Sequence, residues 1–384
     1  MQRLGELLSN IWQARSYKSL PRQGIELLAH KLKINTDFID YYRFGFYKSD
    51  ESWEEKSLYL GPNGSRYWPF EGNSLKFDPL FAVKSIQKSL LIGAGLPTPR
   101  MLLKAGSEYP VNSLEKFRDA LATVRAPVVT KFDGGGGGTD VHVLERSDDG
   151  FSHDGEAVDA EWIWQKYAAR IDRGFLLEER IDNHPALAAI HPASLNTLRL
   201  AVVKTADRRW HFLKPFLKIG RGGSKVDNMS AHGLFTGLDD NGIAGTAYCR
   251  YDDGEYECHP NTGARIRGFQ VPFFDEALAL AVHASKTLGF MSTFGWDIAI
   301  TADGPMIVEA NPGWNFRSVQ QRLGPLLTAK IAAGLMPRAW YTPWDRTRMY
   351  PHYLGHYRGG WWQRRLAARR ERWQERLRSR AGIQ

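Results

Sequence analysis

The chain has 384 residues, 43% hydrophobic and 24% charged, with a formal net charge of +9. A chain of this length and composition can bury one large core or two to three smaller ones. It contains no run of about 18 apolar residues, which excludes a membrane-spanning helix. The first helical segment, Leu4 to Trp12, includes Glu6 and has no long apolar core or cleavage site, so we expect no secretory signal and a cytoplasmic protein.

Residues 1 to about 70 are predicted to form helices and loops rich in aromatic side chains. We interpret these as packing residues rather than a binding site: Phe38, Tyr41, Tyr42, Phe44, Phe46 and Tyr47. A helix pattern then begins at Asp78, continues through Lys84 to Ile92, and ends at Gly93-Ala94-Gly95. No internal repeat of 20 to 50 residues is present.

The segment VVTKFDGGGGGTDVHV, from Val128 to Val143, predicts a β-hairpin with a glycine loop at its tip. Glycine backbones can approach phosphate oxygens closely and offer their N–H groups, while Lys131 supplies a positive charge. Gly134, Gly135, Gly136, Gly137 and Gly138 are therefore candidates for a nucleotide lid. A flexible linker or a long hairpin turn would fit five glycines equally well.

Two later segments place cations in apolar strands. Arg199 lies in SLNTLRL, from Ser194, and Lys218 and Arg221 lie in FLKIGRGGSKVDN, from Phe216. A buried cation needs an anion as partner, because an unpaired buried charge is very costly.

Cys249 and Cys258 are the only cysteines, and they flank YDDGEY. A two-residue turn at Asp253-Gly254 would place them opposite each other in a hairpin, where a disulfide is conceivable. We favour reduced thiols, because a cytoplasmic location keeps thiols reduced and this spacing is poor for a metal site.

The segment GWDIAITADGPMIVEANPGWN, from Gly295 to Asn315, predicts a second hairpin around Ala302-Asp303-Gly304, with Gly304 in the left-handed conformation. In this register Asp297 lies across from Glu309, and Asn311 shares the face of Glu309. Three oxygen ligands of this kind suit Mg²⁺ beside nucleotide phosphates. The alternative is a surface hairpin with solvated acids, which the apolar stripe predicted on the opposite face argues against: Ile298, Ile300, Met306 and Val308.

The tail is strongly basic, since residues 358 to 384 hold nine arginines and two glutamates, a net +7. An apolar stripe runs along a predicted tail helix: Trp362, Leu366, Trp373 and Leu377. This helix could lie on an anionic membrane surface or pack on the body of the protein. Nucleic acid is the least favoured partner, because the rest of the chain has no recognition motif.

Together, these motifs resemble the ATP-grasp superfamily in their order and spacing. They are Lys131 with its glycine loop, LLEERI from Leu176, SLNTLRL, and then Asp297, Glu309 and Asn311. The resemblance covers about residues 75 to 330. It is strongest to the sugar-transfer-associated, glutamate-ligase-related branch, whose relatives join amino acids without ribosomes.

The resemblance implies an α+β ATP-grasp fold in which two α+β subdomains clamp ATP, preceded by a mostly helical region. We expect a helical region at 1–110, a lid subdomain with the glycine loop at 111–185, a catalytic subdomain with the Mg²⁺ site at 186–340 and the basic tail at 341–384.

The resemblance also implies roles for individual residues. Lys131 would contact the nucleotide, and backbone groups of Glu178, Glu179, Arg180 and Ile181 would face adenine, with Asp182 or His184 at the ribose. Arg199, Lys218 and Asn228 would be catalytic, and Asp297, Glu309 and Asn311 would hold two Mg²⁺ ions. Lys84 is an additional candidate phosphate contact, or else a solvated helix lysine. The family's Gly-Gly pair is Ala231-His232-Gly233 here, and His232 is either a general base or a plain surface residue.

The expected activity is an ATP-dependent ligation of a carboxylate to an amine or related nucleophile through an acyl phosphate, in bacterial surface-polysaccharide assembly. Two alternatives stay open, namely a kinase that phosphorylates a hydroxyl group and a non-catalytic nucleotide-binding scaffold.

Overall fold

The computed structural model describes residues 2–33, 38–61, 73, 77–134, 140–147, 150–314 and 316–335. Residues 1–337 form one compact unit. The predicted tail, with its Trp362, Leu366, Trp373 and Leu377 stripe, and Gly135 to Gly138 of the glycine loop lie outside the described residues. No helix in the described ranges is long and apolar enough to cross a membrane.

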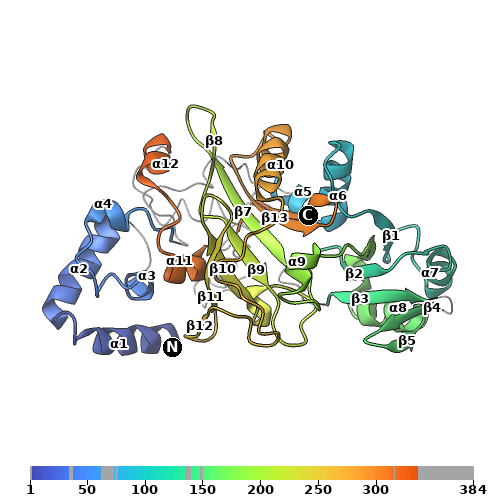
Figure 1. Cartoon of the computed structure of the whole chain (residues 1–384), viewed down its shortest axis with the longest axis horizontal. Helices are drawn as coiled ribbons and strands as arrows, with labels where there is room; N and C mark the ends of the chain where they lie inside the picture. The colour runs from blue at the N-terminus through green and yellow to red at the C-terminus, as the bar shows by residue number, and fades with distance from the viewer. Residues whose placement is uncertain are drawn as a thin grey trace, which may run out of the picture. The chain divides into compact units, whose positions relative to one another are not determined.

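The N-terminal region is helical, with α3 packed against both α1 and α2 (Figure 1). Its small core is aromatic, as predicted, since Tyr41, Tyr42 and Phe46 are buried with Phe44 and Tyr47 packed against them. Phe38 is the exception, because it is 43% exposed. The helices are α1 (Gln2–Ala14), α2 (Leu20–Lys33), α3 (Phe38–Arg43) and α4 (Trp53–Lys56).

The single helix predicted from Asp78 to Ile92 is wrong, because the structure has two helices, α5 (Asp78–Ala82) and α6 (Lys84–Gly93). Val83 between them is extended and forms a β-bridge with Gly134. The backbone N–H of Lys84 donates to the carbonyl of Asp133 at 2.7 Å. This long-range pairing ties the start of α6 to the base of the glycine loop.

The first sheet has six antiparallel strands in the order β1-β6-β2-β3-β4-β5. Helices α7 and α8 pack together, and their side chains share a core with this sheet, centred on Phe117, Tyr167 and Phe175. Its first strand lies before residue 111, where we expected the lid subdomain to begin. The elements are β1 (Met101–Ala105), α7 (Leu114–Leu121), β2 (Val128–Phe132), β3 (His142–Ser147), β4 (Gly150–His153), β5 (Glu156–Val158), α8 (Ala160–Ala168) and β6 (Phe175–Glu179).

The second sheet has eight strands, with β12-β11-β10-β9-β7-β13-β14 in order and β8 paired to β7, and every described pairing is antiparallel. The elements that build or follow it are α9 (Pro185–Ala188), β7 (Thr197–Lys204), β8 (Trp210–Phe212), β9 (Phe216–Ile219), β10 (Leu234–Leu238), β11 (Ala244–Cys249), β12 (Glu255–Tyr256), α10 (Phe274–Thr287), β13 (Thr293–Thr301), β14 (Gly304–Asn311), α11 (Arg317–Leu323) and α12 (Ala329–Gly334). The predicted α+β class is therefore confirmed.

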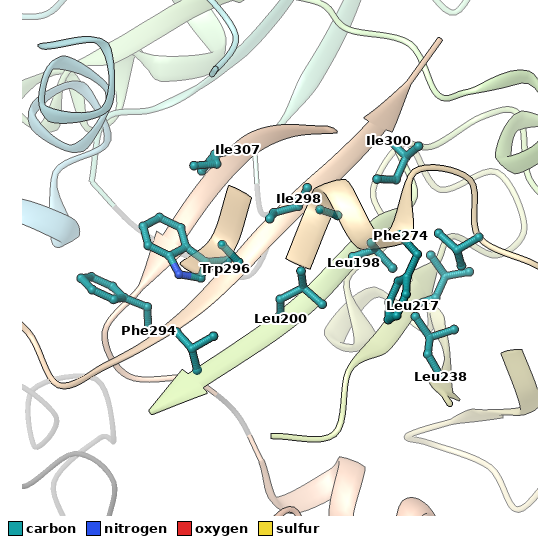
Figure 2. Packing of buried hydrophobic residues seen from close by; sticks show 14 of the residues in the cluster. Leu198, Leu200, Leu217, Leu238, Phe274, Phe294, Trp296, Ile298, Ile300 and Ile307 are labelled. Carbon is teal, nitrogen blue, oxygen red and sulfur yellow. The ribbon is translucent and has the colours of Figure 1, made fainter. Parts of the chain in front are cut away.

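The central strands of this sheet are buried on both faces, and alternation along each strand divides the two faces. On one face, Leu198, Leu200, Trp296 and Ile298 join the main core, which includes residues of α10 (Figure 2). On the other face, Arg199 and its neighbours on β9 and β13 line a cleft. The Leu- and Val-rich run of β7 therefore forms a strand that is buried on both faces, with its polar side chain Arg199 in the cleft rather than in open solvent.

The predicted pairing of Asp297 with Glu309 is confirmed, but the turn and the strand register that produce it differ from the prediction. The turn is one residue tighter than expected, because Gly304, with φ of 119°, already pairs with Thr301. A β-bulge at Val308 then adds the missing residue, since Ile298 pairs with Ile307 and Asp297 with Glu309.

The bulge also corrects the predicted apolar stripe. Ile298 and Ile300 lie in the core as expected, but Ile307 and Ala310 join them in place of Met306 and Val308. Val308 faces the cleft instead.

The predicted pairing of the cysteines is wrong, because Tyr248 pairs with Glu255, which leaves Cys249 opposite no cysteine. Both cysteines are free thiols, Cys249 buried and Cys258 exposed. Cys258 forms a β-bridge with Arg265 instead.

Candidate active site

A cleft of about 560 Å³ is lined by residues of β2, β3 and β6 from the first sheet and of β7, β9, β13 and β14 from the second. That volume is suitable for a ligand of nucleotide size. The lining is highly charged, with eight basic and eight acidic side chains: Lys84, Lys131, Arg170, Arg173, Arg180, Arg199, Lys218, Lys225, Asp140, Glu145, Glu178, Glu179, Asp182, Asp227, Asp297 and Glu309. Because the two signs balance, a polyphosphate would fit best together with a cation that takes up some of the carboxylates.

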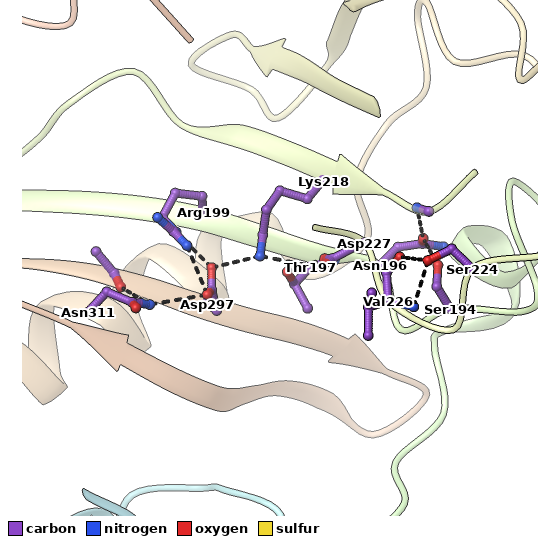
Figure 3. Close-up of polar contacts among 12 residues, drawn as sticks. Ser194, Asn196, Thr197, Arg199, Lys218, Ser224, Val226, Asp227, Asp297 and Asn311 are labelled. Carbon is purple, nitrogen blue, oxygen red and sulfur yellow. Dashed lines mark hydrogen bonds and ion pairs between the residues drawn. The ribbon is translucent and has the colours of Figure 1, made fainter. Parts of the chain in front are cut away.

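Three charged residues from neighbouring strands meet on the cleft face of the second sheet (Figure 3). Arg199 on β7 donates through Nε and Nη2 to Oδ1 and Oδ2 of Asp297 on β13, at 2.7 and 2.9 Å. Lys218 Nζ on β9 lies 3.1 Å from Asp297 Oδ1. The alternation of each strand puts these side chains on one face, and the strand order β9-β7-β13 brings them together.

Burial alone would raise the pKa of Asp297, but Arg199 and Lys218 outweigh it and lower that pKa to about 2. Burial opposes the charge of Arg199 too, and Asp297 raises the pKa of its guanidinium. The pair is therefore ionised at neutral pH. The Nη1 group of Arg199 is not used by Asp297, so it remains as a donor for an anion in the cleft.

Asp227 is the second carboxylate of this cluster, and it precedes the predicted Asn228. Its Oδ2 accepts hydrogen bonds from the backbone N–H and the hydroxyl of Thr197, at 2.9 and 2.5 Å. Lys218 Nζ lies 3.4 Å from its Oδ1, while burial raises the pKa of the Asp227 carboxyl. Asp227 thus fixes the loop that carries Asn228, which lines the cleft.

Asn196 secures the same loop from its other end (Figure 3). Its Oδ1 accepts hydrogen bonds from the backbone N–H of Gly220 at 3.0 Å and from the Ser194 hydroxyl at 2.9 Å. Gly220 has no room for a side chain, because an added Cβ would lie 2.2 Å from Ser194 Oγ. Asn196 and Thr197 therefore hold the two ends of the Gly220–Asn228 loop at the start of β7.

The predicted metal ligands lie together on β13 and β14. Asp297 and Glu309 are direct cross-strand partners, and Asn311 Nδ2 donates to Asp297 Oδ2 at 3.2 Å. Within the described ranges, no three His, Cys, Asp or Glu side chains gather in a metal-binding group, so the candidate set is two carboxylates and one amide.

This donor set fits Mg²⁺, because rotation of the Asn311 amide would present an oxygen, and carboxylate and amide oxygens are its usual protein ligands. Lys84 Nζ lies 3.6 Å from Glu309 Oε1. Lys84 lines the cleft with its side chain only 15% exposed, so the interpretation as a solvated helix lysine is wrong.

Lys131 on β2 points at Glu178 on β6, with Nζ 2.8 Å from Glu178 Oε2. Lys88 on α6 approaches the same oxygen at 3.5 Å. Glu178 Oε1 is buried and has no hydrogen-bond partner among the described residues, although Glu178 lines the cleft. A buried acceptor of this kind is suited to a ligand that brings its own N–H or O–H donor.

Lys88 was not predicted from the sequence. Burial lowers its pKa to about 8, although Glu178 opposes that shift. Lys131 and Lys88 together hold the pKa of Glu178 below its usual value, although burial would raise it. The one available signal was its position four residues after Lys84, which puts both lysines on one face of α6.

Glu179, Arg180 and Ile181, the residues expected to face adenine, and Asp182, a candidate for the ribose, all line the cleft. Arg180 forms ion pairs with Asp182 and Glu145, and Glu179 pairs with Arg100. His184 is not among the lining residues, because its Nδ1 caps α9 by accepting from the N–H of Ala186 at 3.2 Å. Of the two ribose candidates, only Asp182 is in the cleft.

Gly134 lines the cleft at the start of the glycine loop, and the residue before it is a buried anchor. Asp133 accepts from the backbone N–H of Ser85 through Oδ1 and from the Ser85 hydroxyl through Oδ2, both at 2.7 Å. Lys104 Nζ lies 3.1 Å from the same carboxylate. Asp133 therefore fixes the first turn of α6, from which Lys84 reaches the cleft.

His232, the candidate general base, and Arg221, predicted as a cation in need of an anion partner, lie outside the cleft. His232 packs against Tyr251, with ring centroids 4.6 Å apart, and Arg221 pairs with Asp252 at 2.8 Å. Neither lines the cleft. Lys225, which was not predicted, does line it and pairs with Asp154 of the β4–β5 turn at 2.9 Å.

Two antiparallel sheets that line one charged cleft of nucleotide size are the arrangement that the resemblance to ATP-grasp proteins implies. The chain belongs to the sugar-transfer-associated ATP-grasp family, whose model matches residues 66–331. No curated protein matches the sequence significantly.

Solved structures with a similar chain path are distant. A RimK-domain ATP-grasp protein from Sphaerobacter thermophilus is 18% identical with a TM-score of 0.37, covering 67% of this chain and 68% of its own. An L-amino acid ligase from Bacillus licheniformis is 14% identical with a TM-score of 0.36, covering 63% of this chain and 42% of its own. A phosphoribosylamine–glycine ligase from Thermotoga maritima is 14% identical with a TM-score of 0.39, and the match covers 62% of this chain and 49% of the ligase. The chain thus spans less than half the length of the last two, and likenesses this distant do not define an activity.

Proposed function

We propose that the protein is an ATP-dependent ligase that joins a carboxylate to an amine or related nucleophile through an acyl phosphate. The observation that carries this proposal is the buried Arg199–Asp297–Lys218 cluster, which shares one cleft with Glu309, Asn311 and Glu178, whose Oε1 has no hydrogen-bond partner in the described part of the chain. A cluster of both signs beside a polar nucleotide-sized cleft is suited to hold a polyphosphate and a second anion together.

ATP would bind with its base near Glu178 and the segment Glu179 to Asp182. Lys131, Lys84 and the N–H groups of the glycine loop would then face its phosphates. Lys88 would keep Glu178 ionised and in place. The closed loop would exclude water from the reaction.

Asp297, Glu309 and Asn311 would hold Mg²⁺, with two ions as our proposal. Mg²⁺ neutralises charge on the phosphate oxygens. With Asp297 committed to that role, the Nη1 donors of Arg199 and the ammonium group of Lys218 would stabilise negative charge on the transferred group.

The chemistry would take two steps. A substrate carboxylate oxygen attacks the γ-phosphorus, the bond from that phosphorus to the β–γ bridging oxygen breaks, and ADP leaves. The amine nitrogen then attacks the acyl carbon, the acyl–phosphate bond breaks, and inorganic phosphate leaves as the amine loses a proton. Asn228, which follows Asp227 and lines the same cleft as Lys218, would donate to the acyl phosphate.

The family's association with sugar transfer supports a role in bacterial surface-polysaccharide assembly, with a uronic acid or an amino acid as the carboxylate. We place this reaction in the cytoplasm, where ATP is available.

A screen for ADP release against amino acids and sugar acids, with and without hydroxylamine, tests the proposal. Hydroxylamine traps acyl phosphates as hydroxamates, so the proposal predicts ADP and hydroxamate in equal amounts for at least one carboxylate. ADP with a stable phosphate ester and no hydroxamate would identify a kinase instead. Nucleotide binding with no turnover on any carboxylate would favour the scaffold.

A further inference from the structure

Helix α2 is buried along one face and carries an exposed apolar stripe along the opposite face. Gln23, Leu27 and His30 face the protein, with Gln23 and His30 buried. On the other side, Ile25, Leu28 and Leu32 are 71%, 59% and 52% exposed. Spacings of three and four residues place these three side chains in one stripe along the helix. The stripe is not needed for packing α2 on the protein, because the opposite face of the helix makes those contacts.

Exposed apolar side chains are concentrated on the helical N-terminal region, whose helices α1 and α2 are drawn in blue in Figure 1. Of the fourteen large apolar side chains exposed in the described part of the chain, eight lie between residues 8 and 38. On α1, Leu8 and Trp12 are exposed one turn apart, at 57% and 59%. Concentrations of this kind mark a surface that meets an apolar partner.

The charge of the two helices indicates what that partner is. Residues 2–33 contain six basic and two acidic residues, a net +4. One of the two acids, Glu26, is already paired with the buried Lys18 at 2.9 Å. The Arg15 guanidinium lies over the Trp12 ring, 3.6 Å from its centroid. An indole with a stacked guanidinium matches the headgroup level of a bilayer, where the ring meets acyl chains and the cation meets phosphate.

We propose that α1 and α2 form a membrane-docking surface that binds an anionic lipid bilayer through the Ile25, Leu28 and Leu32 stripe and the neighbouring basic residues. The helices lie on the bilayer and do not cross it. The enzyme would thereby work at the membrane surface, independently of which carboxylate it uses.

Flotation of the full chain with vesicles tests this surface. Phosphatidylcholine vesicles are compared with vesicles that also contain phosphatidylglycerol, at low and high salt. Wild type should bind the anionic vesicles, and salt should weaken the binding because it screens the basic residues. Ile25→Glu/Leu28→Glu should reduce the bound fraction by more than about tenfold, since each side chain would bury apolar area in the interface. The melting temperature of this variant should stay that of wild type, because both side chains are exposed.

Two further variants make the result specific. Ile92→Glu changes an apolar side chain that is 51% exposed on α6, and it should bind vesicles as wild type does. Trp362→Gln/Trp373→Gln changes the tail stripe in the full chain. Loss of binding in the α2 variant supports the proposal whether or not the tail variant also loses binding.

The other outcomes overturn it. They are loss of vesicle binding in the tail variant alone, a loss of vesicle binding in Ile92→Glu as large as that in the α2 variant, or no vesicle binding by wild type. A wild-type dimer that the α2 variant converts to a monomer, with no lipid binding, would instead assign the stripe to a second copy of the chain.

Discussion

Arg199 and Asp297 are direct cross-strand partners whose side chains meet in a two-pronged ion pair, at 2.7 and 2.9 Å, on the cleft face of the second sheet. Both are buried, and Lys218 joins them from the strand on the other side of Arg199. A buried charge of this kind has a high energetic cost when its partner is removed. The pair therefore links the stability of the sheet to the chemistry of the cleft.

Replacing Arg199 with Leu should lower the free energy of unfolding by about 3 kcal/mol, because Asp297 would keep only Lys218 as its cationic partner. Urea denaturation measures this change. Arg209→Leu is the matched control, since Arg209 forms an exposed pair with Asp207 and should change stability by less than about 1 kcal/mol. An Arg199→Leu effect as small as that of the control would show that the buried pair does not stabilise the fold.

Asp297 should also make stability depend on pH in the acid range. Its folded pKa of about 2 is below the ordinary value of 3.8, so the folded state binds the proton less well than the unfolded state. The stabilisation, about 2 kcal/mol, is fully present above the unfolded pKa and is lost as the pH falls from about 4 to about 2. Unfolding curves of wild type and Asp297→Asn should thus converge as the pH is lowered through this window. A difference between them that is independent of pH would refute the depressed pKa.

Lys88 should act in the opposite direction at alkaline pH. Its folded pKa is lowered from 10.5 to about 8, so between these values the unfolded state holds more protons than the folded state. The contribution of Lys88 to the free energy of unfolding should therefore rise as the pH increases from about 8 to about 10. Lys88→Met should lack that rise, whereas Lys116→Met, at an exposed lysine on α7, should retain it. Identical profiles for wild type and Lys88→Met would contradict the assignment.

Alternation of side chains was sufficient to predict much of the site. The apolar run around Arg199 predicted a buried cation that needs an anion, and the period of two placed Asp297 opposite the apolar stripe of its hairpin. The pairing of Asp297 with Glu309 was also predicted, because a two-residue turn followed by a bulge shifts the register as much as a three-residue turn does. The bulge itself could not be foreseen, since nothing in the sequence around Val308 distinguishes it from a regular strand. This is why Met306 and Val308 were assigned to the core in place of Ile307 and Ala310.

What the sequence did not reveal depends on contacts between distant segments. Val83 interrupts a helical pattern because it pairs with Gly134, fifty-one residues later. Lys88 reaches Glu178, which lines the cleft, because α6 packs against β1, the neighbour of β6 in the first sheet. Local patterns carry no information about such pairs, whereas the resemblance to a family supplied the residues that its motifs cover.

Binding of Mg-ATP should order the glycine loop, because its N–H groups would bind phosphate oxygens. Hydrogen exchange of the amides from Gly134 to Gly138 should slow with nucleotide in wild type and much less in Lys131→Ala. The turn at Asp239 to Gly242, between β10 and β11, serves as an internal control whose exchange should not change. Exchange in the loop that is the same with and without Mg-ATP would exclude a role as a lid.

The metal site can be tested by a single substitution. Glu309→Gln should leave the melting temperature near that of wild type, because Glu309 is only half-buried, and should reduce ADP release by at least about a hundredfold at saturating Mg²⁺. Glu257→Gln, at an exposed glutamate paired with Arg267, is the control and should turn over as wild type does. Equal turnover in wild type and Glu309→Gln would remove Glu309 from the metal site.

The most direct test of the acyl-phosphate chemistry follows one oxygen atom. The carboxylate that the ADP-release screen selects is labelled with ¹⁸O, and the products are examined by ³¹P NMR and mass spectrometry. In the proposed reaction a carboxylate oxygen attacks phosphorus and later leaves with it, so the inorganic phosphate should contain one ¹⁸O atom per turnover. Phosphate without the label, or a phosphorylated product that keeps both labelled oxygens on its carboxylate, would contradict the proposed ligase.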